Sequence, residues 1–345
     1  MKRKIIFITA FLLILTIFIT SCNTNNLVEY KKASEKTDQI IRGQTAGEFT
    51  TTTEVNQDGL TAEEIKEQNY IKDMKGSFSL VFDDEKEKSI IRSYMNFGGL
   101  GYDFEVYMNG EEASIKLPLI GKYLRIDEKM MSEGVEYYDG GSQIISEESR
   151  QDFTKKWLSL MNDDDVFKGK NIVLTTPDGE VKTTEYTIKL SDRQIKSLLN
   201  DSAEILKKDQ SLESFYEKNI RSNIEKIEDE LAKNTSGSEK QSFEEFLNNI
   251  VAGAEKFKVE NFSYTAHVDI DGYIVNEVID ISLKAIDAKR EGITGMNYKL
   301  DIKTWDINKD QKFDFPVLTD ENTIKPDQMK DNMPDIMKDY FNKAD

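Results

Sequence analysis

The chain has 345 residues, a formal net charge of −18 and a single cysteine. Such an acidic surface repels nucleic acid and anionic lipid headgroups, which both bind through clustered Lys and Arg, so nucleic acid is excluded as a partner. The single cysteine excludes a disulfide within the chain, and the fold must therefore be stabilised by a hydrophobic core.

Residues 1–21 have the pattern of a secretory signal peptide. Lys2, Arg3 and Lys4 precede an apolar stretch that ends at Ile19 and is short for a membrane span, which needs about 20 apolar residues. The sequence Ile-Thr-Ser-Cys then ends at Cys22 and resembles the lipobox of bacterial lipoproteins. This resemblance implies cleavage before Cys22 and acyl chains that anchor the protein to the extracytoplasmic face of the cell membrane. The alternative is an uncleaved signal anchor.

Residues 22–26 form a short polar tether that carries the lipid. Apolar or small residues then recur at three- and four-residue spacing from Leu27 to Ile41, which predicts a weakly amphipathic helix. The Thr-rich stretch 45–57 follows and is expected to begin a sheet.

Strands are predicted next from the alternation of apolar and polar residues. Residues 77–82 and 102–109 alternate clearly, and 90–97 reads as a further strand between them. Asn109-Gly110 is expected to form a type I′ hairpin turn, after which residues 115–126 continue the alternation.

The middle of the chain is predicted to be mainly helical. A helix is expected from Ser149 to Met161, and Pro177-Asp178-Gly179 forms a turn between two strands over 171–190. Capping boxes at Ser191 and Ser242 begin two further amphipathic helical regions, which the polar stretch 234–238 separates.

The last third has the clearest strand pattern, over 262–270, 273–285 and 296–302, with Asp271-Gly272 as a turn. Each strand is apolar on one side only, which is typical of antiparallel sheets. We therefore expect an α+β fold, a large curved antiparallel β-sheet (half-barrel) wrapped over amphipathic helices. Residues 27–345 are taken as one domain, with strand lobes at about 43–190 and 258–318 joined by helices over 191–257.

This layout resembles the half-barrel lipoproteins related to the carrier LolA and to the LppX/LprG group. The similar features are the lipobox, the passage from a strand into a capped helix at 186–191, and a closing strand at 313–316. The helical region 191–257 is longer than the lid of the carrier. The resemblance implies a pocket for an acyl chain or another apolar ligand between sheet and helices, and it implies no catalytic residue.

Six apolar or aromatic residues are the candidates to line that pocket. They are drawn from the predicted strands and helices: Phe104, Val106, Trp157, Phe246, Tyr264 and Tyr298. For Trp157, filling of the core is the stronger interpretation.

The sequence offers no set of residues for catalysis, a metal or another cofactor. His267 is the only histidine, and its strand places it on a polar, solvated face. Asp306, Asn308 and Asp310 have the spacing of a calcium loop, but Gln311 stands where that loop needs glycine. A polar turn after Trp305, followed by a strand, is the preferred interpretation.

Three functions remain. The first is a membrane-anchored, non-enzymatic protein that binds a lipid or similar apolar ligand between sheet and helices. The second is a scaffold module with a solid core, whose acidic surface binds another envelope protein. The third, a hydrolase that uses carboxylates alone, has little support because paired carboxylates arise by chance among 64 acidic residues.

Overall fold

The computed structural model describes most of the chain between residues 26 and 324. Cys22 and the predicted signal peptide lie outside the described residues. Within that range the description omits residues 59–60, 63–64, 66–68, 70–71, 98, 111, 117–120, 127–144, 222–241 and 288–291.

The described residues form one open sheet of twelve strands. The first six strands are β1 (Arg42–Asn56), β2 (Asp73–Asp83), β3 (Lys88–Phe97), β4 (Leu100–Asn109), β5 (Glu112–Lys116) and β6 (Tyr123–Ile126). The others are β7 (Val166–Thr176), β8 (Gly179–Lys189), β9 (Phe257–Asp269), β10 (Ile274–Ala285), β11 (Gly292–Trp305) and β12 (Thr323–Ile324).

The spatial order of the strands is β12-β6-β5-β4-β3-β2-β1-β11-β10-β9-β8-β7, so the two edge strands do not meet. Every pair is antiparallel except β12 with β6. The contact between β1 and β11 joins the early and late strands into a continuous sheet. β7 and β8 lie beside β9, although they precede the central helices in the sequence.

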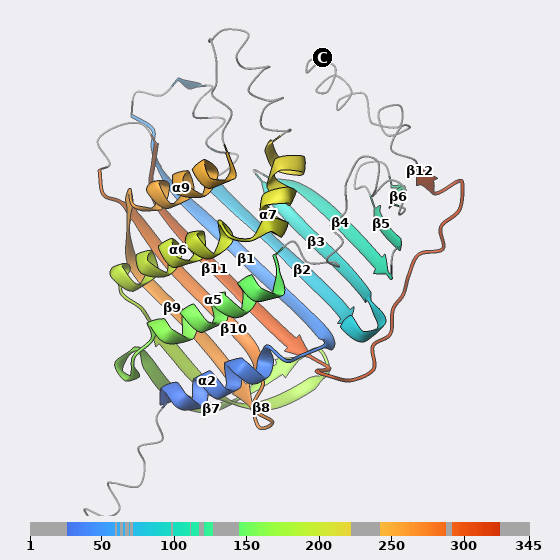
Figure 1. Ribbon diagram of the computed structural model, residues 1–345, viewed down its shortest axis with the longest axis horizontal. Coiled ribbons are helices and arrows are strands. Elements are labelled where there is room, and N and C mark those ends of the chain that lie inside the picture. The colour runs from blue at the N-terminus through green and yellow to red at the C-terminus, as the bar shows by residue number, and fades with distance from the viewer. Residues whose placement is uncertain are drawn as a thin grey trace, which may run out of the picture.

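Helices cover one face of this sheet. They are α2 (Asn26–Thr37), α5 (Glu147–Leu160), α6 (Asp192–Leu206), α7 (Gln210–Phe215), a π-helical turn (Tyr216–Arg221) and α9 (Phe243–Ala254). Figure 1 shows α2, α5, α6 and α9 in front of the part of the sheet that contains β9, β10 and β11, whereas β3, β4 and β5 extend to the right of them. The α+β half-barrel fold predicted from the sequence is confirmed.

Two of the three helix starts predicted at serine residues are confirmed. The Ser191 and Ser242 side chains each accept a hydrogen bond from the backbone three residues later and complete a capping box. The start predicted at Ser149 was wrong, because Ser146 caps α5 and accepts from the Ser149 amide. Only Ser149 is followed three residues later by an acidic residue, Asp152, whereas Ser146 directly precedes two glutamates in the first turn of α5.

The predicted hairpin at Asn109-Gly110 is shifted by one residue. Asn109 of β4 pairs with Glu112 of β5, so Asn109 ends a strand and is not a turn residue. Gly110 follows it with a positive φ of 61°. The turn at Asp271-Gly272 forms as predicted, with Gly272 at φ 86°.

The main core lies where α2 and α5 pack on β7 to β10. Ile188 and Ala266 are fully buried there, and Tyr30 of α2 is 1% exposed. A second, smaller cluster joins the helices around Tyr216, Phe243 and Leu247. The predicted helix near the N-terminus therefore forms and buries one face, although it ends at Thr37 and not at Ile41.

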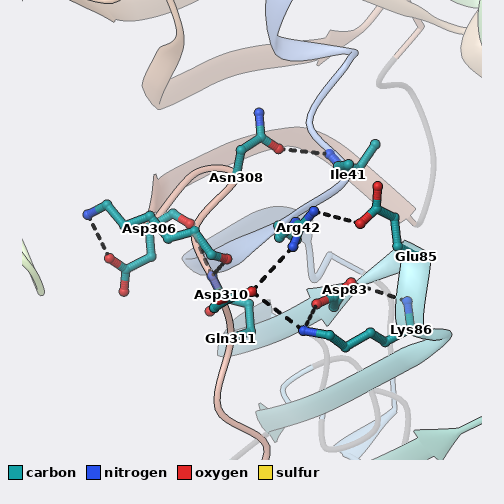
Figure 2. Close-up of polar contacts among 10 residues, drawn as sticks. Ile41, Arg42, Asp83, Glu85, Lys86, Asp306, Asn308, Asp310 and Gln311 are labelled. Carbon is teal, nitrogen blue, oxygen red and sulfur yellow. Dashed lines mark hydrogen bonds and ion pairs between the residues drawn. The ribbon is translucent and has the colours of Figure 1, made fainter.

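A polar turn follows β11 and ties the C-terminal segment to the start of β1 (Figure 2). Arg42 contacts Glu85 at 2.6 Å and Asp310 at 3.4 Å. Lys86 contacts the fully buried Asp83 at 2.9 Å and also reaches Asp310. The Asp310 carboxylate is thus engaged by protein cations, in agreement with the predicted polar turn.

The strand predicted after this turn was wrong. Residues 310–319 have no regular secondary structure and cross the face of the sheet opposite the helices. Phe315 packs on Tyr107 of β4, with ring centroids 6.5 Å apart, and Phe313 stacks on Phe315. Alternating phenylalanines predict a strand. Here the Phe315 ring instead packs on Tyr107 of the sheet, and the backbone of residues 310–319 pairs with none of the described strands.

Candidate functional site

The helix-bearing face of the sheet is apolar on both sides of the β1 to β11 contact. Directly paired residues trace this face from β9 to β4 in the order Tyr264, Ile279, Leu300, Phe49, Gly76, Met95 and Tyr102. The alternation of apolar and polar side chains therefore continues from β9 and β10, which lie under the helices, to β3 and β4, which lie beyond them.

The degree of burial differs along this face. Core side chains under α2 and α5 are fully or almost fully buried, whereas the apolar side chains on β1 to β5 are only half-buried and Phe104 is 38% exposed. We call the latter set the apolar wing: Phe49, Phe78, Leu80, Phe82, Ile91, Met95, Tyr102, Phe104, Val106, Met108 and Ile115. A half-exposed apolar surface of this kind is typical of a binding region.

Two glycines allow aromatic rings of the apolar wing to lie directly against the backbone of the neighbouring strand. A Cβ on Gly47 would lie 2.6 Å from the Phe78 ring, and one on Gly76 would lie 2.5 Å from the Phe49 ring. Gly47 pairs with Phe78 and Gly76 pairs with Phe49 in the same ladder, so each ring lies over the glycine opposite it. The rings therefore lie close to the backbone and form a broad aromatic surface between β1 and β2.

The structure brings together two of the six predicted ligand-binding residues. The rings of Trp157 and Tyr264 lie 5.6 Å apart, edge to face, and Tyr264 belongs to the packed core. Trp157 also packs against that core and against Phe262. This pair fills the space between sheet and helices, where the sequence analysis had expected a ligand.

A chain of buried hydrogen bonds runs through the same place. The Trp157 indole donates to the Tyr30 hydroxyl at 2.8 Å, and the Tyr264 hydroxyl donates to Glu277 at 2.5 Å. Burial raises the pKa of Tyr30 to about 12, and it also raises the pKa of Glu277 despite the hydrogen bond from Tyr264. The hydrogen bonds among these buried groups join α2 and α5 to the sheet.

The other four candidates are spread over separate places. Phe104 and Val106 belong to the apolar wing on β4. Tyr298 lies on the same face of β11, where burial raises the pKa of its hydroxyl. Phe246 packs against Tyr216 at 4.9 Å within the second helical cluster. The assignment of these residues to ligand binding remains a prediction.

His267 is on the face opposite the helices, as its strand predicted, but it is not solvated. It is 7% exposed and lies 3.7 Å from Glu185 on β8. The tip of the β7–β8 hairpin curls over this face, where Lys303 donates to the Thr175 carbonyl at 3.2 Å. Strand alternation gives the face of a residue, but it gives no information about a distant hairpin that covers it.

A carboxylate that the sequence patterns did not indicate is buried at a junction of helices. Asp209 caps α7 by accepting from the Ser211 and Leu212 amides, and its other oxygen accepts from the amide and hydroxyl of Ser146, which caps α5. Burial alone would raise the pKa of Asp209, but hydrogen bonds from Ser149, Ser146 and Leu212 outweigh it and lower the pKa to about 2. Asp209 lies inside the helical region predicted to begin at Ser191, so the available signal was only that aspartate is a frequent N-cap residue.

The described part of the chain contains neither a candidate metal site nor a candidate membrane-spanning helix. No group of three or more His, Cys, Asp or Glu side chains there could hold a metal ion. Among the same residues, no helix has both the length and the apolar character needed to cross a membrane. Cys22, the predicted lipidation site, lies outside the described residues.

No protein-family model matches the sequence. No curated protein matches it either. Solved structures with some similarity include a DUF1329 family protein from Desulfovibrio piger, at 10% identity over 83% of this chain and 94% of that one, with a TM-score of 0.17.

A second is a β-barrel-like protein of the DUF1849 family from Brucella abortus, at 8% identity over 77% of this chain and 99% of that one, with a TM-score of 0.19. TM-scores this low carry no argument about fold or function. The architecture therefore rests on the strands and helices of this chain alone.

Proposed function

We propose that the protein is a membrane-anchored, non-enzymatic binding protein that takes a lipid acyl chain or a similar apolar ligand on its apolar wing. The observation that carries this proposal is the half-buried aromatic and aliphatic surface on β1 to β5, beside a fully packed helical core. Burying such a surface against an acyl chain gains about 25 cal/mol for each Å² removed from water.

The ligand then lies on the apolar wing and not between the sheet and the helices, where the sequence predicted it. Trp157 and Tyr264 fill the space under α2 and α5, so an acyl chain there would have to displace the core. Phe104 and Val106 lie on the open side of the same face and can contact a ligand without that cost. The helices then form one wall of the binding surface.

Lipid extraction tests this function. Residues 25–345 are purified from a bacterial host and extracted with organic solvent, and mass spectrometry measures bound lipid. We expect a stoichiometric lipid, or uptake of a fluorescent fatty acid that Phe104→Ser weakens. Phe167→Ser is the matched control, since Phe167 is 50% exposed on β7 and lies outside the apolar wing. Clean protein that takes up no fluorescent lipid would contradict the proposal.

The anchor is tested separately. Cells that express the full chain are labelled with radioactive palmitate, and their membranes are separated from soluble material. We expect label on the protein and membrane association, both lost in Cys22→Ser. A Ser21→Ala variant, which keeps a small residue before the cysteine, should be labelled as the original chain is. Labelling that persists in Cys22→Ser would contradict acylation at this residue.

The packed core favours a second function, an interaction module for another envelope protein. In that case the apolar wing would be covered by a protein partner and not by lipid. Crosslinking in cells from a photoreactive residue at position 104 distinguishes the two, because a protein partner gives a discrete crosslinked band and a lipid gives none.

A further inference from the structure

The face of the sheet opposite the helices contains a cavity of about 770 Å³ that crosses β11 and β1 to β5. Its volume falls within the range of about 300 to 1,000 Å³ that small-molecule sites occupy. The floor contains small residues from β1, β2 and β4, namely Ala46, Ser77, Ser79 and Gly101. Ala46 pairs with Ser79, and Ser77 lies two residues before Ser79 on the same face of β2. These small side chains therefore lie together at the centre of the cavity.

An aromatic ring lies flat against one end of this floor. A Cβ on Gly101 would come within 2.7 to 3.1 Å of the Tyr94 hydroxyl and ring, so the ring lies over the glycine on the adjacent strand. The Asn96 amide donates to the Tyr94 hydroxyl at 3.2 Å and fixes the ring. One face of Tyr94 thus covers the sheet, and the other is directed to the cavity that Tyr94 and Gly101 line.

Charged side chains of both signs surround the ring. The lining holds three basic and four acidic residues, so the cavity is nearly neutral although the whole chain is strongly acidic. Glu105 accepts from Lys116 at 2.5 Å, and Asp301 accepts from the Asn276 amide at 2.6 Å. These contacts hold planar polar groups in place before a ligand arrives.

Two carboxylates are left for a ligand. Glu48, Ser77, Tyr94 and Asp103 occupy one row across β1 to β4, because each is paired with the next. Within the described part of the chain, neither Glu48 nor Asp103 has a hydrogen bond or ion pair to a side chain. Carboxylates on both sides of an exposed ring accept hydrogen bonds from hydroxyl groups.

We propose that this cavity binds a neutral oligosaccharide. One face of a sugar ring presents C–H groups, which pack on the negative face of an aromatic ring such as Tyr94. Its edge presents hydroxyl groups that donate to Glu48 and Asp103 and accept from Arg92. The balance of charges in the lining disfavours both a polycation and a polyanion. Phe78 and Phe104 border the cavity, but their rings lie on the other face of the sheet and belong to the apolar wing.

Saturation-transfer NMR with the full chain in detergent micelles tests this site. The probes are chitohexaose and cellohexaose, with spermidine and heparin as charged comparisons. We expect one or both hexasaccharides to bind, and Tyr94→Ala to weaken that binding about tenfold because the stacking surface is lost. Tyr94→Phe keeps the ring and should retain binding. Phe167→Ala is the control for an exposed aromatic residue outside the cavity.

Each outcome decides the proposal. Hexasaccharide binding that depends on the Tyr94 ring supports it, provided that the thermal unfolding of Tyr94→Ala matches that of the original chain. Binding of spermidine or heparin alone overturns it, and so does the absence of any hexasaccharide signal at millimolar concentration. Hexasaccharide binding unchanged in both Tyr94→Ala and Asp103→Asn also overturns it. The lipid assay is independent, since it reports on the opposite face of the sheet.

Discussion

The two halves of the helix-bearing face differ in burial although their sequences follow the same alternation. On β8 and β9, Ile188 and Ala266 are fully buried beneath helices. On β4, Phe104 and Val106 occupy equivalent positions on the same face and remain partly exposed. The comparison teaches that an alternating strand identifies which side chains share a face, whereas the helices decide which of them become core.

The largest effect is expected in the covered half. Ile188→Ala leaves a cavity in a fully buried site and should lower the free energy of unfolding by about 3 kcal/mol. Ile91→Ala removes the same atoms from the half-buried wing and should cost less than half of that value. Urea unfolding, followed by circular dichroism, measures both. Equal losses would show that the wing is covered as completely as the core.

The next effect concerns the helical cover itself. Asp209→Ala removes the acceptor for the N-termini of both α5 and α7, and we expect a loss of about 2 kcal/mol. The lowered pKa of Asp209, about 2, means that its stabilisation is present above pH 4 and disappears as the pH falls towards 2.

Unfolding curves between pH 2 and pH 7 test this dependence for Asp209. The original chain should lose more stability on acidification than Asp209→Asn, which has no carboxyl to protonate. Glu148→Gln, at an exposed position at the start of α5, serves as the control and should keep the original pH dependence. Parallel curves for Asp209→Asn and the original chain would contradict the assignment.

A smaller effect is expected from the floor of the apolar wing. Gly47→Ala places a methyl group 2.6 Å from the Phe78 ring, and displacement of that ring should cost about 1 kcal/mol. In the double variant Gly47→Ala/Phe78→Ala the clash is absent, so the two changes should not be additive. Thermal unfolding measures the four chains of this cycle, and strict additivity would show that the ring does not lie over Gly47.

The smallest effect comes from the buried carboxyl beside Tyr264. Since burial raises the pKa of Glu277, the folded chain binds more protons than the unfolded chain above pH 4.5, and this residue lowers stability as the pH rises. Glu277→Gln should therefore be slightly more stable than the original chain at pH 7 and similar to it at pH 4. Asp280→Asn, on an exposed position of β10, is the control. A destabilised Glu277→Gln at pH 7 would contradict this sign.

Much of the fold could be predicted from local patterns. Alternation located the strands around Phe78, Phe104 and Tyr264, and capping residues located helices at Ser191 and Ser242. These signals are local, because a strand or a helix start depends on residues within a few positions. Where two local signals competed, as at Ser146 and Ser149, the structure decided between them.

The candidate site could be predicted only in part. The sequence placed Phe104 and Val106 on an apolar face, but it also placed Trp157 and Tyr264 in a pocket that the structure fills. The Tyr94 ring was not singled out at all, because its role depends on Gly101 of the adjacent strand. Cross-strand contacts of this kind are set by register, which no short segment encodes.

The sequence by itself predicts a signal peptide and a lipobox at Cys22, and it determined the antiparallel strands and the faces on which their side chains lie. Each of these follows from chemistry within a short stretch of chain. Only the tertiary structure decided that β11 pairs with β1, that helices cover one half of the sheet, and that His267 is buried. These features require contacts between residues far apart in the sequence, whose free energies depend on the packing of the whole molecule.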